Sequence, residues 1–104
     1  MPTGAGRPEQ DTDTNGASDH DRWLRGLGAR LRRLRRERRY SQEDFALAAG
    51  IARTYYGEVE RGERNIAAVN LIKIALTLEV EVGELFPSRS ELLGQPGGGA
   101  EAGG

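Results

Sequence analysis

The sequence predicts an all-α domain, because apolar residues recur at helical spacing along its middle and nothing in it requires a strand. Serine and glycine residues at the ends of these stretches divide the domain into five helices. At 104 residues the chain has room for one domain, which we expect over residues 20–93. Residues 1–19 are acidic and residues 94–104 are rich in glycine, so both are expected to be disordered tails.

The first helix is expected over residues 20 to 38, with a capping start between Ser18 and Asp21. Its helical spacing is carried by Trp23, Leu24, Leu27, Leu31 and Leu34. Gly26 and Gly28 each weaken this helix by roughly 1 kcal/mol relative to alanine.

The next two helices are short and meet at a glycine turn. Ser41 is an N-cap candidate for the second helix, and Gly50 stands where a helix ends in the left-handed conformation. A third helical pattern covers residues 53–60 and ends at Gly62. Helices of about eight residues are marginal alone, so the two must pack on their neighbours. The small side chain of Ala46 allows a close crossing, which predicts a helix-turn-helix.

The fourth helix is expected from Ala68 to Leu78, where apolar residues form a broad face. Ala67 supplies no side-chain cap at its start, and Asn65 could cap it instead. A fifth, short helix over residues 82–87 is expected to direct Leu85 and Phe86 inward. Residues 88–93 either extend that helix or contact a partner chain.

Basic charge is concentrated in the middle of the chain. Residues 22–66 contain twelve arginines against six acidic residues, whereas the net charge of the whole chain is -1. Two interpretations stay open at this point: a basic patch for an anionic partner, or a solvated basic helix.

Composition excludes several kinds of site. With no cysteine and one histidine, the chain has no disulfide, no thiolate metal site and no imidazole cluster. No carboxylate pair or nucleophile-base set is positioned by the helices, so we expect no enzyme activity, no catalytic or metal residue and no cofactor. The absence of a signal-like start and of an apolar run of about 18 residues predicts a cytoplasmic protein without a membrane segment.

The motifs RLRRLRRER, SQEDFALAAGI, VERGERN and LIKIALTLEVEVGELF follow one another with short spacings. In this order they resemble the XRE family, the lambdoid phage repressor and Cro type of five-helix DNA-binding domain, over residues 24–86. Within that family, RTYYGEVERGERN is similar to the controller proteins of restriction-modification systems. Arg39 departs from the family pattern, which usually has glycine there, and a left-handed residue other than glycine costs roughly 1 kcal/mol.

The resemblance implies that residues 53–60 lie in the major groove of DNA, with the N-terminal end reaching base edges. The base-reading candidates are Arg53, Thr54, Gly57 and Glu58, the last two as outward positions. Arg53 can bind guanine through two hydrogen bonds, the alternative being a phosphate contact alone. Thr54 could touch a thymine methyl group, and Glu58 could accept from cytosine N4 or repel wrong sites.

Phosphate contacts are expected from Gln42, Tyr55, Arg61, Arg64 and Asn65. For Tyr55 the alternative is an ordinary surface tyrosine. Tyr56 faces inward, and we expect its hydroxyl to point toward solvent or phosphate. The resemblance also implies that Glu60 forms a structural ion pair with Arg35 and is no catalytic acid.

The function expected from these residues is that of a transcriptional regulator, for example a repressor, that binds double-stranded DNA at a palindromic operator as a homodimer. The candidate interface consists of Val82, Leu85, Phe86, Leu92 and Leu93, unless these complete the monomer core. The alternative function is a protein-interaction module, such as an antitoxin or a coactivator-like adaptor. Such a module would bind its partner through the acidic N-terminal tail or the C-terminal helix.

Overall fold

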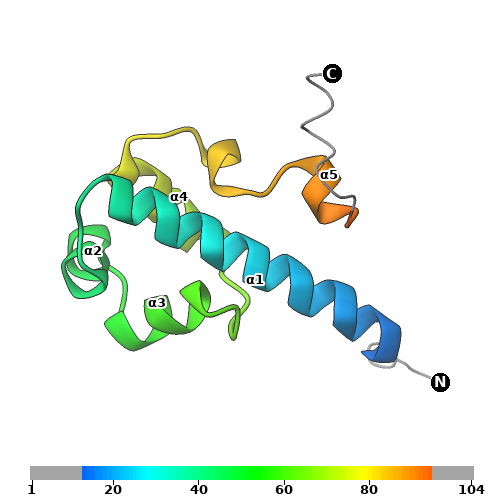
Figure 1. Cartoon of the computed structure of the whole chain (residues 1–104). Coiled ribbons are helices and arrows are strands. Elements are labelled where there is room, and N and C mark those ends of the chain that lie inside the picture. Colours follow the sequence, from blue (N-terminus) through cyan, green and yellow to red (C-terminus); the bar gives the residue numbers. More distant parts are fainter. Residues whose placement is uncertain (1–12, 95–104) are drawn as a thin grey trace, which may run out of the picture.

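The computed structural model describes residues 13–94, with side chains from residue 19, and every regular element in this range is helical (Figure 1). The elements in chain order are α1 (Asp13–Glu37), α2 (Gln42–Ala49), α3 (Arg53–Glu60), α4 (Ala68–Leu78), the 3-10 turn η1 (Val82–Leu85) and α5 (Arg89–Leu92). The all-α prediction is confirmed. Within the described residues, no helix combines the length and the apolar character needed to cross a membrane.

Helix α1 is the longest of the described elements, and its N-terminal turns extend beyond the helices that pack around the rest of it (Figure 1). Helix α3 packs against α1 and α2, and α4 packs against α2 and η1. The chain then returns to α1, which η1 and α5 both contact. This arrangement leaves the two short helices of the helix-turn-helix braced by α1 on one side and α4 on the other.

The core lies where these helices meet. Its largest fully buried side chains are Tyr56, Phe45, Leu31, Ile74, Leu78, Leu85 and Val59. The ring of Phe45 lies between two other aromatic rings, with centroid distances of 5.2 Å to Tyr40 and 5.2 Å to Tyr56. Edge-to-face and tilted pairs of this kind stabilise a core beyond the area they bury.

The predicted helix ends are confirmed around the turn. The Ser41 hydroxyl accepts a hydrogen bond of 3.0 Å from the backbone N–H of Asp44, and Gly50 is left-handed with φ of 73°. Arg39 is also left-handed (φ 62°), as expected for a position where the family has glycine. Glu79 ends α4 in the same conformation (φ 61°), although glutamate is not a residue that favours it.

Helix α1 starts earlier than predicted, so the expected start near residue 20 and the cap between Ser18 and Asp21 are wrong. Residues 13–19 contain no proline, the residue that ends a helix most strongly. The other tail residues, 1–12 and 95–104, lie outside the described residues.

The C-terminal part differs from the prediction in two ways. The helix expected over residues 82–87 is the shorter 3-10 turn η1. Residues 88–93 do not extend it but contain the separate helix α5, which has its own capping box at Ser88. Leu85 is buried as expected, but Phe86 is 40% exposed, so its inward orientation is wrong. Phe86 takes an extended conformation because it precedes Pro87, and this ends the turn before its ring can reach the core.

Candidate nucleic-acid interface

Helix α3 is held close to α1 by two glycines. A Cβ atom at Gly28 of α1 would meet the backbone carbonyls of Val59 and Glu60 at the end of α3. A Cβ atom at Gly62, which is left-handed with φ of 76°, would lie 2.8 Å from the Cα atom of Arg25. The backbones therefore touch at these points, and this contact sets where α3 ends relative to α1.

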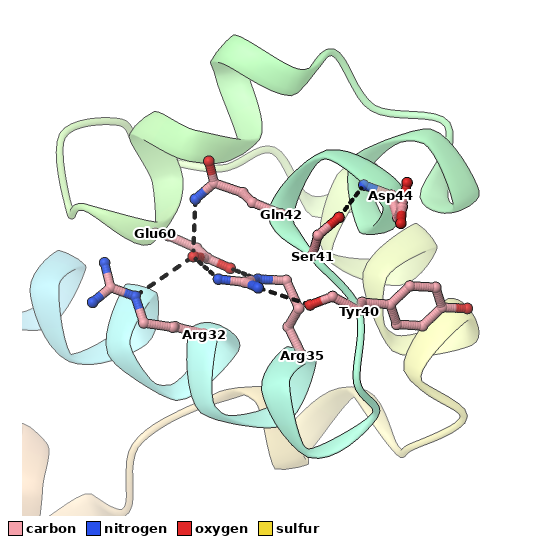
Figure 2. Close-up of polar contacts among 7 residues, drawn as sticks. All are labelled: Arg32, Arg35, Tyr40, Ser41, Gln42, Asp44 and Glu60. Atoms are coloured by element: carbon pink, nitrogen blue, oxygen red, sulfur yellow. Dashed lines mark hydrogen bonds and ion pairs between the residues drawn. The ribbon is translucent and has the colours of Figure 1, made fainter.

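A buried ion pair joins the same two helices (Figure 2). The Glu60 carboxylate accepts hydrogen bonds from Arg35 Nε (2.7 Å) and Nη2 (3.0 Å), and both side chains are at least nine-tenths buried. Arg35 also donates to the carbonyl of Tyr40 (2.9 Å), which follows α1. Gln42, the first residue of α2, donates to Glu60 at 3.1 Å. One carboxylate thus connects α1, α2 and α3.

The surroundings of Glu60 favour its charged form. Burial alone would raise the pKa of Glu60, but the hydrogen bonds from Arg35 and Gln42 and the charge of Arg35 bring this pKa below its ordinary value. The hydrogen bonds to Glu60 raise the pKa of Arg35 in spite of its burial. The pair is therefore ionised at neutral pH, and it braces the fold because separating the helices would leave a buried charge without its partner.

The Tyr56 hydroxyl lies next to this pair, so the expectation that it points toward solvent or phosphate is wrong. The side chain is fully buried, and its hydroxyl has no hydrogen-bond partner of good geometry among the described residues. Burial raises the pKa of Tyr56, and the neighbouring Glu60 carboxylate raises it further. The reason is helical spacing: Tyr56 and Glu60 are four residues apart and share the inner face of α3.

The N-terminal end of α3 is free. Arg53 and Thr54 are both exposed, and no described acidic residue pairs with Arg53. Ala52 precedes the helix without a side-chain cap, so no side-chain oxygen covers the first backbone N–H groups. The arrangement leaves both side chains able to reach an external ligand.

Gly57 does not face outward as predicted, because it is buried under Gln42 and Arg61. A Cβ atom here would lie 3.2 Å from Gln42 Oε1 and 3.4 Å from Arg61 Nη1. The glycine therefore makes room for the Gln42 side chain on its way to Glu60. Helical spacing within α3 could not predict this burial, because the Gln42 side chain that covers Gly57 comes from α2.

Three of the predicted DNA-contacting residues form a cluster: Tyr55 and Glu58 on α3, and Arg64 on the turn that follows it. Arg64 Nε and Nη2 donate to Glu58 Oε1 at 2.9 and 2.8 Å, and the guanidinium carbon of Arg64 lies 5.4 Å from the centroid of the Tyr55 ring. The Tyr55 hydroxyl accepts a hydrogen bond of 3.2 Å from the backbone N–H of Ala67, the residue that precedes α4. Tyr55 is consequently half-buried and replaces the side-chain cap that Ala67 lacks and that Asn65 was expected to supply.

The remaining phosphate candidates lie on the turn or at the start of α2. Arg61 and Asn65 are exposed, and Arg61 pairs with Glu63 at 3.1 Å, which raises the pKa of Arg61. Gln42 is half-buried and has its amide group committed to Glu60. The structure thus places an open arginine and threonine at the N-terminal end of α3 and two more arginines on the turn after its C-terminal end.

The helix-turn-helix geometry has close counterparts in known proteins. A family model described as "Helix-turn-helix" matches residues 31–85. The control protein C.MunI from Mycoplasma sp is 45% identical over 61 residues, which cover 58% of this chain and 82% of that protein.

Solved structures agree with this match. The restriction-modification controller protein C.AhdI from Aeromonas hydrophila is similar with a TM-score of 0.59 and 48% identity, over 61% of this chain and 96% of the other. A hypothetical transcription factor NHTF from Neisseria is similar with a TM-score of 0.60 and 36% identity, over 71% of this chain and 86% of the other.

Proposed function

We propose that this chain, which belongs to the helix-turn-helix family of DNA-binding transcriptional regulators, binds a palindromic operator as a homodimer through α3. Proteins of this family are not enzymes. One observation carries the proposal: α3 has a free, exposed N-terminal end at Arg53 while its other end is locked to the fold through Glu60. A rigid helix with an open leading end is what entry into a major groove requires. Binding to DNA also supports a cytoplasmic location as part of this proposal.

Base reading is assigned to the first turn of α3. The exposed Arg53 guanidinium has no hydrogen-bond acceptor among the described side chains and can bind guanine O6 and N7, and the exposed Thr54 beside it can contact a thymine methyl group. The turn after α3 would contact DNA phosphates next to the groove through Arg61, Arg64 and Asn65. These contacts position the helix without selecting a base sequence.

The homodimer is supported by an apolar stripe on α4. Val69, Ile72 and Leu76 share one face of this helix at helical spacing and are 62%, 47% and 73% exposed. Leu85, by contrast, is part of the monomer core and cannot serve the interface expected from the sequence. Burying the α4 stripe against a second copy would remove apolar surface from water and place two α3 helices on one duplex.

The names of the similar proteins indicate which class of genes this protein would regulate. C.MunI is named a control protein and C.AhdI a restriction-modification controller, and this chain covers most of the length of each. We therefore include in the proposal that this protein controls genes of a restriction-modification system.

Selection from random duplexes tests the DNA-binding proposal. The wild-type protein should enrich a palindrome, and Arg53→Ala should lose preference at one position of each half-site, at a cost of about 1 to 3 kcal/mol per position. Arg36→Ala, which removes an exposed arginine of α1, is the matched control and should keep the same motif. Absence of any enriched motif for the wild type, or an unchanged motif for Arg53→Ala, would contradict the proposal.

Sedimentation velocity tests the dimer. Ile72→Asp should convert the dimer to a monomer, whereas Phe86→Asp, a change at a similarly exposed residue of the C-terminal part, should not. The reverse result would move the interface to the residues expected from the sequence.

No described contact favours the alternative of a protein-interaction module. The C-terminal helix α5 is already engaged, because the Leu92 carbonyl accepts hydrogen bonds from Arg22 (2.8 Å) and Trp23 (2.7 Å) of α1. The part of the acidic tail before Asp13 lies outside the described residues.

A further inference from the structure

We infer that Glu58 is a positioning residue for Arg64 and does not itself read a base. Glu58 would hold the Arg64 guanidinium beside α3 so that Arg64 meets a DNA phosphate. The inference rests on the proposed DNA binding and deepens it, because it reassigns a residue of the same surface.

The contacts of Glu58 leave it poorly suited to accept from cytosine. Its Oε1 atom receives both Arg64 Nε and Nη2, at 2.9 and 2.8 Å, and its side chain is 27% exposed. Only its Oε2 atom has no described partner, so a base would have to bind a carboxylate whose charge Arg64 already offsets and whose Oε1 atom Arg64 holds in place. The pair also offsets the negative charge, which otherwise would repel the duplex.

Arg64 keeps donors for a second anion. A guanidinium has five N–H donors in a planar fork, and Glu58 takes one from each of two nitrogens. Three donors stay available on a side chain of which 51% is exposed, and a phosphate is the anion that such a fork suits.

Tyr55 holds the arginine from another direction. The guanidinium lies over its ring at 5.4 Å, and the ring is anchored because the hydroxyl accepts from the N–H of Ala67. Arg64 is thus held between the outer face of α3 and the start of α4. An arginine fixed in this way loses less conformational freedom on binding than one in a mobile turn.

A second ion pair in the same turn supplies the control. Arg61 and Glu63 are 3.1 Å apart, with side chains 50% and 55% exposed, and no ring lies against Arg61 among the described aromatic contacts. Such a pair holds its arginine weakly. Removing Glu63 should change DNA affinity through its charge alone.

The two carboxylates therefore predict effects of opposite sign. Loss of an acid near DNA normally raises affinity, so Glu63→Ala should bind the operator as tightly as the wild type or more tightly. Glu58→Ala should bind about tenfold more weakly despite the same charge change, because Arg64 loses its support. Glu58→Gln keeps an acceptor oxygen and should recover part of this loss.

A double-mutant cycle on the selected operator completes the test. Arg64→Ala should lower affinity and reduce the salt slope by about 1, and adding Glu58→Ala should cause no further loss. The enriched base sequence should be the same for Glu58→Ala and the wild type. Melting temperatures of all variants are measured to confirm that each one is folded.

Two kinds of failure are separable. Higher affinity of Glu58→Ala, additive losses with Arg64→Ala, or a relaxed base position in the selected motif would overturn the inference alone. A wild-type protein that enriches no motif would overturn the proposed function, and the inference with it.

Discussion

Removing the buried Glu60 carboxylate should destabilise the fold strongly. In Glu60→Ala the Arg35 guanidinium, whose side chain is 8% exposed, loses both charged hydrogen bonds and keeps only the one to the Tyr40 carbonyl. Leaving one charge of a buried pair without its partner costs about 3 to 5 kcal/mol. Arg32 lies 3.6 Å from the carboxylate and is 44% exposed, so water reaches this edge of the site. We therefore expect the lower end, about 3 kcal/mol.

Thermal and urea unfolding, followed by circular dichroism, measure this loss. For a domain of this size each kcal/mol shifts the melting temperature by about 4 to 8 °C, so Glu60→Ala should melt about 12 to 24 °C lower. The matched control is the double variant Arg35→Met with Glu60→Leu, which removes both charges and fills the space. This control should be close to the wild type in stability, because no buried charge is left unpaired.

Two outcomes would contradict a buried, bracing ion pair. A Glu60→Ala variant that loses less than about 1 kcal/mol would mean that the pair is solvated and does not brace α3. A double variant as unstable as Glu60→Ala would mean that lost packing, and not the orphaned arginine, causes the effect.

Three further predictions concern stability. Gly28→Ala should lower the free energy of unfolding by about 1 to 3 kcal/mol in chemical denaturation, because the added Cβ atom meets the backbone of α3. Gly26→Ala is the control and should cost less, because its Cβ atom would lie 3.3 Å from a side-chain atom of Pro87. Equal losses would exclude the close backbone approach as the cause. Arg39→Gly should stabilise by up to about 1 kcal/mol in the same assay, because φ at this position is 62°, and a loss would show that the Arg39 side chain matters. The pKa of Glu60 is lower in the folded than in the unfolded state, so its contribution is present above the unfolded value of about 4.3 and is lost as pH falls through the folded pKa. Unfolding between pH 6 and 2 should therefore depend on pH more steeply for the wild type than for Glu60→Gln, and parallel curves would contradict the shift.

Local features of the structure were accessible from the sequence. The helix ends at Ser41 and Gly50 follow from capping preferences that involve neighbouring residues alone. The left-handed Arg39 was expected from the resemblance, because the family usually has glycine at this position. The error at the start of α1 is also local in origin, because a polar stretch carries no periodicity to mark a helix.

Contacts between helices were not accessible in the same way. The burial of Gly57 depends on the Gln42 side chain, and the partner of Glu58 is Arg64 on the following turn. Both contacts are tertiary, because each joins residues that the packing of α3 against α2 or the following turn brings together. The outward orientation of Gly57 was predicted from helical spacing, which has no information about a side chain arriving from α2.

The sequence by itself therefore determined the helices, the turn between α2 and α3, and the exposed arginine that leads α3. The tertiary structure alone decided which of the other surface residues are free. In the folded chain Tyr56 lies against Glu60, and Gln42 covers Gly57. Glu58 is paired with Arg64. The physical reason is that helix formation depends on residues three or four apart, whereas availability to a ligand depends on charges and backbones brought together by packing.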